Sequence, residues 1–129
     1  MKSGKVTGIG GVFLTSEDPE ATKKWYHKHL GIEMDAYGHM FTSEEETESS
    51  KQMLQWSVMK KGDDYLKPTS EPFMINYRVD DLEKLLEKLK DLNVELCDEI
   101  ETFSYGKFLH IIDCDGRKLE LWEPIESGF

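Results

Sequence analysis

Residues 107–124 read KFLHIIDCDGRKLELWEP, and they contain two short runs of alternating residues around a turn signal. The runs over 107–113 and 118–123 are typical of strands, because successive side chains of a strand point to opposite faces of a sheet. Asp115-Gly116 between them favours a tight hairpin turn. The stretch therefore predicts an antiparallel hairpin that places one set of side chains in a core and the alternate set on the opposite face.

The order of elements that leads to this hairpin occurs twice in the chain. A strand over 6–15 precedes a helix from Pro19 to about Leu30, with Asp18 as its N-cap and Gly31 as its left-handed stop. A strand over 73–79 precedes a second helix, whose leucines follow the i, i+3, i+4, i+7 spacing of an amphipathic helix. Further strands are predicted over 32–36, 38–42 and 53–60 after the first helix, and over 94–98, 107–113 and 118–123 after the second. The sequence thus predicts an α+β fold of two βαβββ modules, at about 5–60 and 72–124, within a single domain over 1–129.

The connections between these elements carry their own signals. Asp80-Asp81 is expected to cap the second helix, and Asn93 to end it. The segment 43–50 is a run of Ser, Thr and Glu and predicts a solvated loop, whereas 61–72 links the two modules. Tyr65 is the aromatic residue of this link, and it either covers a pocket or packs against its own loop.

Composition narrows the classes of partner. The chain has 129 residues and a formal net charge of -10, from 16 Lys and Arg against 26 Asp and Glu. This balance disfavours a nucleic acid or an anionic membrane surface, because binding to either needs clustered basic side chains. No run approaches the roughly 20 apolar residues of a membrane span, and the first residues lack the apolar stretch of a signal peptide. Cys97 and Cys114 match no metal or redox spacing and are expected to be free thiols of a cytoplasmic protein.

Several motifs resemble those of one superfamily. The closing segment, 113–124, is similar to a D-P-D-G-N-x-I-E-L-W ending, with Cys114 in place of Pro and Arg117 in place of Asn. The segments 8–13 and 18–20, together with Leu30-Gly31, resemble the first strand and helix of the vicinal oxygen chelate superfamily, which includes glyoxalase I, bleomycin-resistance proteins and extradiol dioxygenases. The segments 73–82 and 105–108 are similar to a bacterial glyoxalase-like subgroup. The resemblance implies that the two modules form a curved mixed sheet around a trough, with the helices on the outer face, and that the protein is a homodimer.

The resemblance also implies a divalent metal ion, bound by side chains from the first and last strands of each module. At the two first-strand positions this chain has Gly11 and Met74, neither of which can act as a normal ligand. Gln55 and Glu120 occupy the last-strand positions. We therefore expect no metal and no other cofactor. The alternative is a metal-dependent glyoxalase-like lyase or isomerase, with Glu120, His110 and Gln55 as ligands of a rebuilt site.

Strand alternation predicts which side chains line the trough instead. The last hairpin contributes Glu120 and His110, which are the candidate catalytic residues. The predicted ligand-binding residues are Phe13, Gln55, Trp56, Met74, Asn76, Arg78, Phe108 and Trp122. An apolar and aromatic lining with few polar groups is typical of a small-molecule site.

Each polar or large residue of this lining has more than one interpretation. His110 is a general acid or base, a ligand of a rebuilt metal site, or a histidine satisfied by a cross-strand carboxylate. Glu120 is a base, an anchor for a cationic ligand, or the ion-pair partner of Arg78, which could alternatively hold a ligand carboxylate. Trp56 and Trp122 are stacking walls or core residues. The prediction is a protein that binds a small organic molecule, cationic or planar, in the sheet trough.

Overall fold

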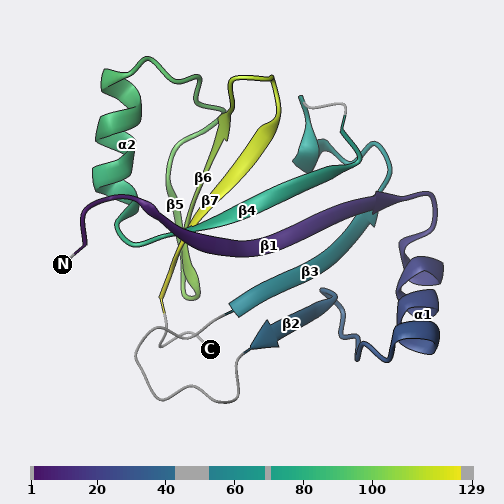
Figure 1. The fold of residues 1–129 in the computed structure, drawn as a ribbon. Coiled ribbons are helices and arrows are strands. Elements are labelled where there is room, and N and C mark those ends of the chain that lie inside the picture. Colours follow the sequence, from purple (N-terminus) through teal and green to yellow (C-terminus); the bar gives the residue numbers. More distant parts are fainter. Residues whose placement is uncertain (1, 43–52, 69–70, 126–129) are drawn as a thin grey trace.

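The computed structural model describes residues 2–42, 53–68 and 71–125. Its elements are β1 (Val6–Ser16), α1 (Pro19–Leu30), β2 (His39–Thr42), β3 (Met53–Lys60), η1 (Asp64–Leu66), β4 (Phe73–Val79), α2 (Leu82–Asp91), β5 (Glu101–Phe103), β6 (Gly106–Ile112) and β7 (Lys118–Pro124). The strands form one sheet in the order β2-β3-β1-β4-β7-β6-β5, drawn in Figure 1. The sheet is mixed, because β1 runs parallel to β3 and β4 parallel to β7, while β1 and β4 pair antiparallel. The predicted α+β class and curved mixed sheet are confirmed.

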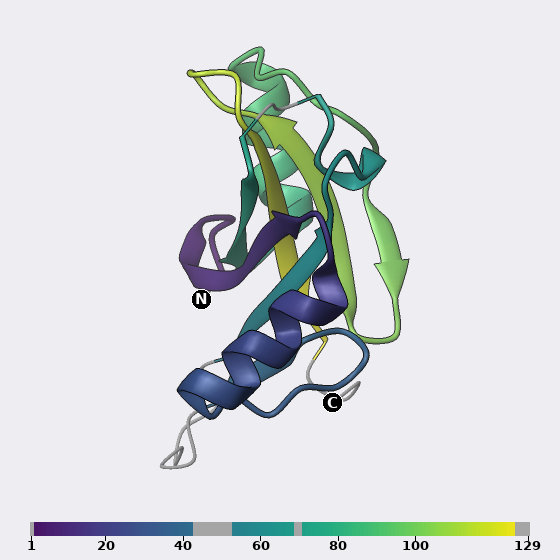
Figure 2. The same cartoon turned by 90° about the vertical axis from the view of Figure 1, so that its right-hand side faces the viewer.

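The two helices cover different parts of the sheet. Figure 1 shows α2 beside the strands β4 to β7, and α1 at the opposite end, beside β1 and β3. Turning the molecule by 90° brings α1 in front of the sheet and α2 behind it (Figure 2). The predicted caps form as expected: the Asp18 side chain accepts from the backbone N–H of Ala21, and Gly31 adopts a φ of 72°. In α2 the cap is Asp81, which accepts from Lys84.

The main hydrophobic core lies between α2 and the sheet. Its buried members are Val79, Leu82, Leu109, Ile111 and Leu121, and the remaining leucines of α2 pack against them. The predicted inward residues of the last hairpin therefore do face a core. The contact of α1 is smaller, since none of the residues of Pro19–Leu30 is buried. Its Tyr26 ring packs on Trp56 of β3 at a centroid distance of 4.7 Å.

Two of the predicted strands do not form. The segment 32–36 contributes only an isolated bridge between Asp35 and Gly38, because it turns back on itself at that point. The segment 94–98 contributes only a bridge between Leu96 and Ile111, since the Asp98 side chain, rather than a backbone carbonyl, accepts the next N–H of β6. The sequence did not predict β5. The loop predicted over 43–50 lies outside the described residues.

Asp80 has a different role from the predicted one. Its carboxylate accepts hydrogen bonds from the backbone N–H groups of Ser3, Gly4 and Lys5, at 3.1, 2.9 and 2.8 Å, and so fastens the N-terminal segment to the end of β4. These backbone donors, first among them Lys5, lower the pKa of Asp80 to about 2. Within the described part of the chain, no helix has the length and apolar character needed to span a membrane.

Candidate functional site

A pocket of about 640 Å³ lies on the face of the sheet opposite the helices. Alternation defines this face: Gln55 lines the pocket while the adjacent Trp56 packs on α1, and Glu120 lines it while the adjacent Leu121 is in the core beneath α2. The pocket is lined by Gly10, Phe13, Asp35, Ala36, Tyr37, Met40, Gln55, Ser57, Val58, Met59, Tyr65, Asn76, Tyr105, Phe108, Glu120 and Trp122. Both halves of the chain therefore contribute to one cavity.

A row of four residues crosses the centre of the sheet beneath this pocket. Gly11 of β1 pairs with Gln55 of β3 on one side and with Asn76 of β4 on the other, and Asn76 pairs with Glu120 of β7. The row takes one residue from the first and one from the last strand of each half. The register therefore brings Asn76, rather than the predicted Met74, beside Glu120.

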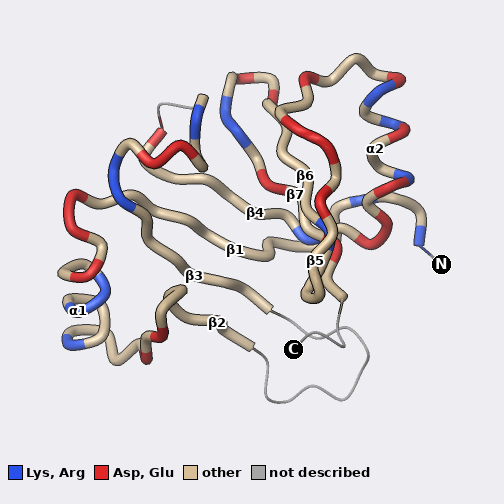
Figure 3. Tube along the Cα trace, turned by 180° about the vertical axis from the view of Figure 1, so that it is seen from behind, with Lys and Arg blue, Asp and Glu red and all other residues tan. Residues whose placement is uncertain are grey.

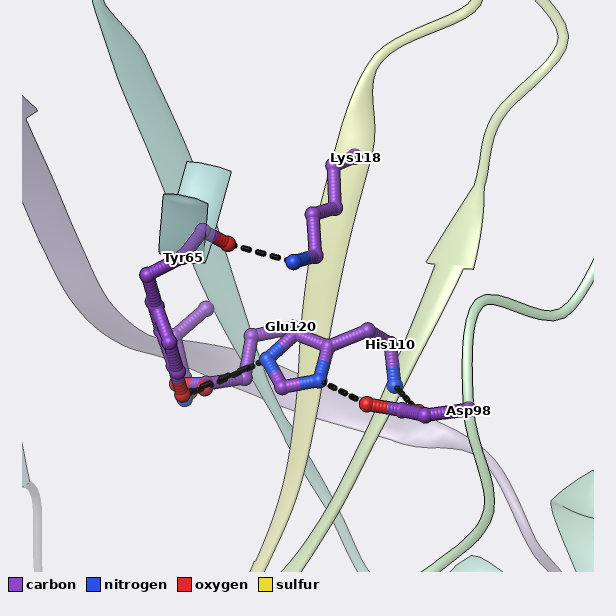
Figure 4. A network of polar contacts seen from close by, with 6 residues as sticks. Tyr65, Asp98, His110, Lys118 and Glu120 are labelled. Carbon is purple, nitrogen blue, oxygen red and sulfur yellow. Dashed lines mark hydrogen bonds and ion pairs between the residues drawn. The ribbon is translucent and has the colours of Figure 1, made fainter. Parts of the chain in front are cut away.

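Glu120 is the centre of a buried hydrogen-bond network, shown in Figure 4. Its side chain is only 1% exposed. One carboxylate oxygen accepts from Asn76 Nδ2 at 2.6 Å, and the other accepts from His110 Nε2 at 2.8 Å and from the hydroxyl of Tyr65. A buried carboxylate is stable only when such donors replace the lost water. The predicted juxtaposition of His110 and Glu120 is confirmed, and they face each other directly across β6 and β7.

His110 lies between two carboxylates. Its Nδ1 lies 2.6 Å from the Asp98 side chain, which also accepts the His110 backbone N–H at 2.8 Å, and its Nε2 faces Glu120. Burial alone would lower the pKa of His110, but the hydrogen bonds and negative charges of Glu120 and Asp98 outweigh burial and raise the pKa above its ordinary value. The geometry therefore favours an imidazolium that carries the positive charge between the two acids.

Tyr65 reaches the site from the link between the two halves. Its ring lies edge-on to Phe13 and to His110, with centroid distances of 6.5 and 5.1 Å, and its hydroxyl donates to Glu120. Lys118 holds this residue in place, because its ammonium donates to the Tyr65 carbonyl and lies 5.3 Å from the ring centre. Burial, followed by the charge of Glu120, raises the pKa of the Tyr65 hydroxyl far above its usual range. Tyr65 thus covers Glu120 as a neutral donor and forms part of the pocket wall.

Aromatic side chains form much of the rest of the wall. Phe108 and Trp122 stack with parallel rings at 6.0 Å, and Tyr105 meets Phe108 edge-on at 5.7 Å. The indole N–H of Trp122 donates to the carbonyl of Tyr105 at 3.3 Å, which joins the stack to the turn between β5 and β6. On another side of the pocket, the Gln55 amide donates to the backbone carbonyl of Tyr37 at 3.1 Å and so holds the turn that contains Tyr37 against β3.

The structure brings together most of the predicted site residues. Phe13, Gln55, Asn76, Phe108, Glu120 and Trp122 line the pocket, and His110 lies directly behind Glu120. Three others lie elsewhere. Trp56 packs on Tyr26 of α1, and Met74 is buried against Phe13 and Leu66. Arg78 donates to the carbonyl of Met53 at 2.9 Å, and of the alternatives for Glu120 the structure shows an ion pair with His110 and not with Arg78.

Sequence reasoning missed the second partner of His110. Asp98 follows an interrupted edge segment, and no spacing rule links it to a histidine 12 residues later. Tyr105, Tyr37 and Asp35 also line the pocket from turns, where strand alternation gives no signal. Tyr65 was the one loop aromatic that the sequence did single out, because an aromatic residue among polar neighbours needs a packing partner.

The residues present do not fit the metal site that the superfamily resemblance implies. The central row offers two amides, a glycine and one carboxylate, and that carboxylate already accepts from three protein donors. Across residues 2–42, 53–68 and 71–125, no three His, Cys, Asp or Glu side chains are grouped so that they could hold a metal ion. The donor set thus provides a hydrogen-bonded acid–base cluster in place of a coordination sphere.

Comparison with known proteins agrees with this fold. The family model of the Glyoxalase/Bleomycin resistance protein/Dioxygenase superfamily matches residues 8–121, and the chain belongs to this superfamily. A search of curated proteins found no match.

Solved structures with the same fold differ widely in sequence from this chain. Methylmalonyl-CoA epimerase from Mycobacterium tuberculosis is 20% identical with a TM-score of 0.60, over 97% of this chain and 93% of that one. A variant of the epimerase from Streptomyces coelicolor, in complex with 2-nitronate-propionyl-CoA, is 18% identical with a TM-score of 0.66, over 92% and 98%. A superfamily member from Vibrio splendidus 12B01 is 14% identical with a TM-score of 0.56, over 92% and 99%. These similarities establish the fold alone.

Proposed function

We propose that the protein binds a small organic molecule in the pocket of the sheet and does so without a metal ion. The observation that carries this proposal is the pocket itself. It has a volume of about 640 Å³, and its lining includes six aromatic residues and the buried carboxylate of Glu120. Apolar and aromatic walls with a few oriented polar groups are the usual composition of a small-molecule site. Polar groups inside an otherwise apolar pocket support small-molecule binding over a module that only packs against other proteins.

The absence of a metal from the proposal rests on the donors around Glu120. Tyr65, Asn76 and His110 all donate to its two oxygens, so a metal ion would have to break these hydrogen bonds before it could bind. The amide nitrogen of Gln55, the further ligand of the alternative metal-dependent lyase or isomerase, donates to backbone carbonyls and to Ser57 at the pocket rim, which fixes the orientation of that side chain. The network supports binding, with the acid–base cluster as an orienting group.

Metal content tests one half of the proposal. Protein purified without chelator and analysed by inductively coupled plasma mass spectrometry is expected to contain far less than one equivalent of Mn, Fe, Ni or Zn. A near-stoichiometric amount of any of these metals would overturn the metal-free proposal if a chelator removed both the metal and the binding of the small-molecule probe described next.

A flat neutral probe tests the other half. We expect 2-naphthylmethanol to shift the amide NMR signals of residues 10, 55, 76 and 122, which surround the pocket. Phe108→Ala should weaken binding about five- to tenfold, because the ring contributes stacking and apolar contact. Phe41→Ala provides the matched control, since Phe41 is exposed on β2 and is not among the pocket residues. Equal loss in both variants, or shifts confined to other surfaces, would contradict the location.

We also propose a homodimer and a cytoplasmic location. The superfamily resemblance supports the dimer, and Trp25 and Leu30 on the outer helix α1, which are 53% and 59% exposed, are candidate interface residues. Light scattering coupled to gel filtration should give twice the mass of the chain, and a monomer mass would reject the dimer. The free thiols of Cys97 and Cys114 are consistent with a reducing compartment, which imaging of a fluorescent fusion can check.

A further inference from the structure

The charged groups of the pocket wall all have the same sign. Of the described residues that line it, Asp35 and Glu120 are the charged ones, and Lys, Arg and His are absent from the lining. Figure 3 shows from behind that the central strands β1, β3 and β4 are mostly uncharged, while both basic and acidic residues gather on the helices and connections. A ligand that enters this pocket therefore meets two carboxylates on a wall whose described residues include no cation, and the His110 ring lies behind Glu120.

The cations nearest the pocket are already engaged. Lys118 donates to the Tyr65 carbonyl, Arg78 donates to the Met53 carbonyl, and the His110 imidazole is held between Asp98 and Glu120. The cluster of Asp98, His110 and Glu120 has a formal charge of -1 when the imidazole is protonated and -2 when it is neutral. Asp35 at the rim lies outside this cluster. An anionic ligand group thus has no free partner among the described pocket residues.

An unpaired acceptor lies beside Glu120. Asn76 is 2% exposed, and while its Nδ2 donates to Glu120, its Oδ1 is buried with no hydrogen-bond partner in the described structure. A Cβ on Gly10 would lie only 2.4 Å from this oxygen, so the oxygen packs against the bare backbone of Gly10, which also lines the pocket. A buried carbonyl oxygen without a donor costs free energy, and a ligand N–H placed there would recover it.

The walls around this acceptor suit a flat body attached to a positive charge. Phe108 and Trp122 stack with an interplanar angle of 5°, and the Tyr105 and Tyr65 rings complete the wall. Aromatic faces attract cations by their negative quadrupole, and they stack with other aromatic rings.

We propose that the ligand is an organic cation: a flat aromatic or apolar body with a charged nitrogen that lies near Glu120 and donates an N–H to Asn76 Oδ1. The inference rests on the proposed function, that this pocket binds a small organic molecule, and adds the chemical class. It also separates the chain from its structural neighbours whose printed ligands are CoA esters, because those ligands carry negative charge and this pocket offers no cation to hold it.

Three naphthalene probes that differ in charge test the proposal. The probes are 2-naphthylmethylamine, 2-naphthylmethanol and 2-naphthoate, titrated into the full chain at pH 7 by isothermal calorimetry and amide NMR. We expect the amine to bind about tenfold or more tightly than the alcohol, because a charge-assisted hydrogen bond replaces a neutral one, and the carboxylate to bind most weakly. Amine affinity should fall as NaCl is raised, whereas alcohol affinity should not.

The outcomes separate this inference from the proposed function. If the three probes bind equally well, or the carboxylate binds best, the cation class is wrong while small-molecule binding stands. If none binds in the pocket at millimolar concentration, both proposals fail.

A pair of neutralising variants tests the charge at the rim. Asp35→Asn keeps the side-chain oxygen that accepts from the Tyr37 N–H at 2.8 Å, but removes the charge, and should weaken the amine about two- to fivefold without changing the alcohol. Glu33→Gln is the matched control, because Glu33 lies two residues away with a side chain that is 83% exposed and is not part of the pocket. Equal amine affinity in wild type and Asp35→Asn, or equal weakening in both variants, would contradict a role for the rim carboxylate and with it the proposal.

Discussion

Replacing Glu120 by glutamine should make the His110 imidazolium much less stable. The glutamine side chain would keep the size of the original and an oxygen able to accept from His110 Nε2, but not the negative charge that now lies 2.8 Å away. Both side chains are buried, so water cannot replace the lost interaction. A hydrogen bond to a charged group contributes about 1.5–3 kcal/mol. Because about 1.4 kcal/mol corresponds to a factor of ten, the protonation constant of His110 should fall roughly ten- to a hundredfold.

NMR titration of the imidazole ring measures this change directly. In the wild type the pKa of His110 should lie above the ordinary value, because Glu120 and Asp98 outweigh the effect of burial. In Glu120→Gln the pKa should be lower than in the wild type. Asp98→Asn is the companion variant, and it should lower the pKa by less, since the Asp98 side chain is 36% exposed and its charge is partly screened by solvent. If the pKa of His110 were the same in the wild type and in both variants, the hydrogen-bond network described here would be refuted.

The same coupling predicts how stability depends on pH. A group whose pKa is higher in the folded than in the unfolded chain stabilises the fold most below the unfolded value, here about 6.5, and loses that effect as pH rises through the folded pKa. The free energy of unfolding of the wild type should therefore fall as pH is raised above about 6.5. Urea unfolding of Glu120→Gln should show a smaller fall over the same range, and a steeper one would contradict the sign.

Three further substitutions test individual contacts by urea unfolding. Asp80→Asn should reduce the loss of stability that the wild type shows as pH falls from about 4 to about 2, because the lowered pKa of Asp80 stabilises the fold only while the group is ionised; an unchanged acid profile would contradict the three-donor contact. Leu82→Ala should cost about 2–5 kcal/mol, because Leu82 is fully buried in the core beneath α2, whereas Leu92→Ala at an exposed position should change stability by less than about 0.5 kcal/mol. Tyr65→Phe should cost about 1–3 kcal/mol by removing a donor to Glu120, and the exposed Tyr37 provides the control as Tyr37→Phe; equal effects of the two would show that the hydroxyl contact is not made.

The part of the site that could be predicted from sequence is the part built on regular strands. The Asp115-Gly116 turn fixes the register of the last hairpin, and a register with period two then places His110 and Glu120 on one face. By the same rule Gln55 and Trp56 point to opposite faces of β3, although near the end of that strand the consecutive residues Ser57, Val58 and Met59 all line the pocket. A helix on one side of β3 takes Trp56, and the neighbouring residue must point away from it.

Sequence reasoning failed where a side chain reaches the site from irregular backbone. The Asp98 side chain accepts the backbone N–H of His110 and lies against its ring, so a side-chain hydrogen bond replaces a backbone one between neighbouring strands. No periodic pattern in the sequence predicts such a replacement. Tyr65 belongs to a single turn of 3-10 helix, and its position depends on Lys118, 53 residues later in the chain. Such contacts follow from the folded arrangement of the elements and not from local propensity.

The residues around Glu120 form a set in which each member requires the next. Glu120 is the acidic residue of the central row, and its buried charge needs hydrogen-bond donors and a positive charge close by. Asn76 and Tyr65 supply neutral donors, and His110 supplies the positive charge. A buried imidazolium also has an Nδ1–H group that needs an acceptor, and the Asp98 carboxylate is that acceptor. Asp98 lies where a regular edge strand would otherwise continue. The loop aromatic Tyr65 and the broken edge strand at Asp98 are therefore connected features of a single arrangement, in which His110 is the positively charged group of the chain that pairs with Glu120.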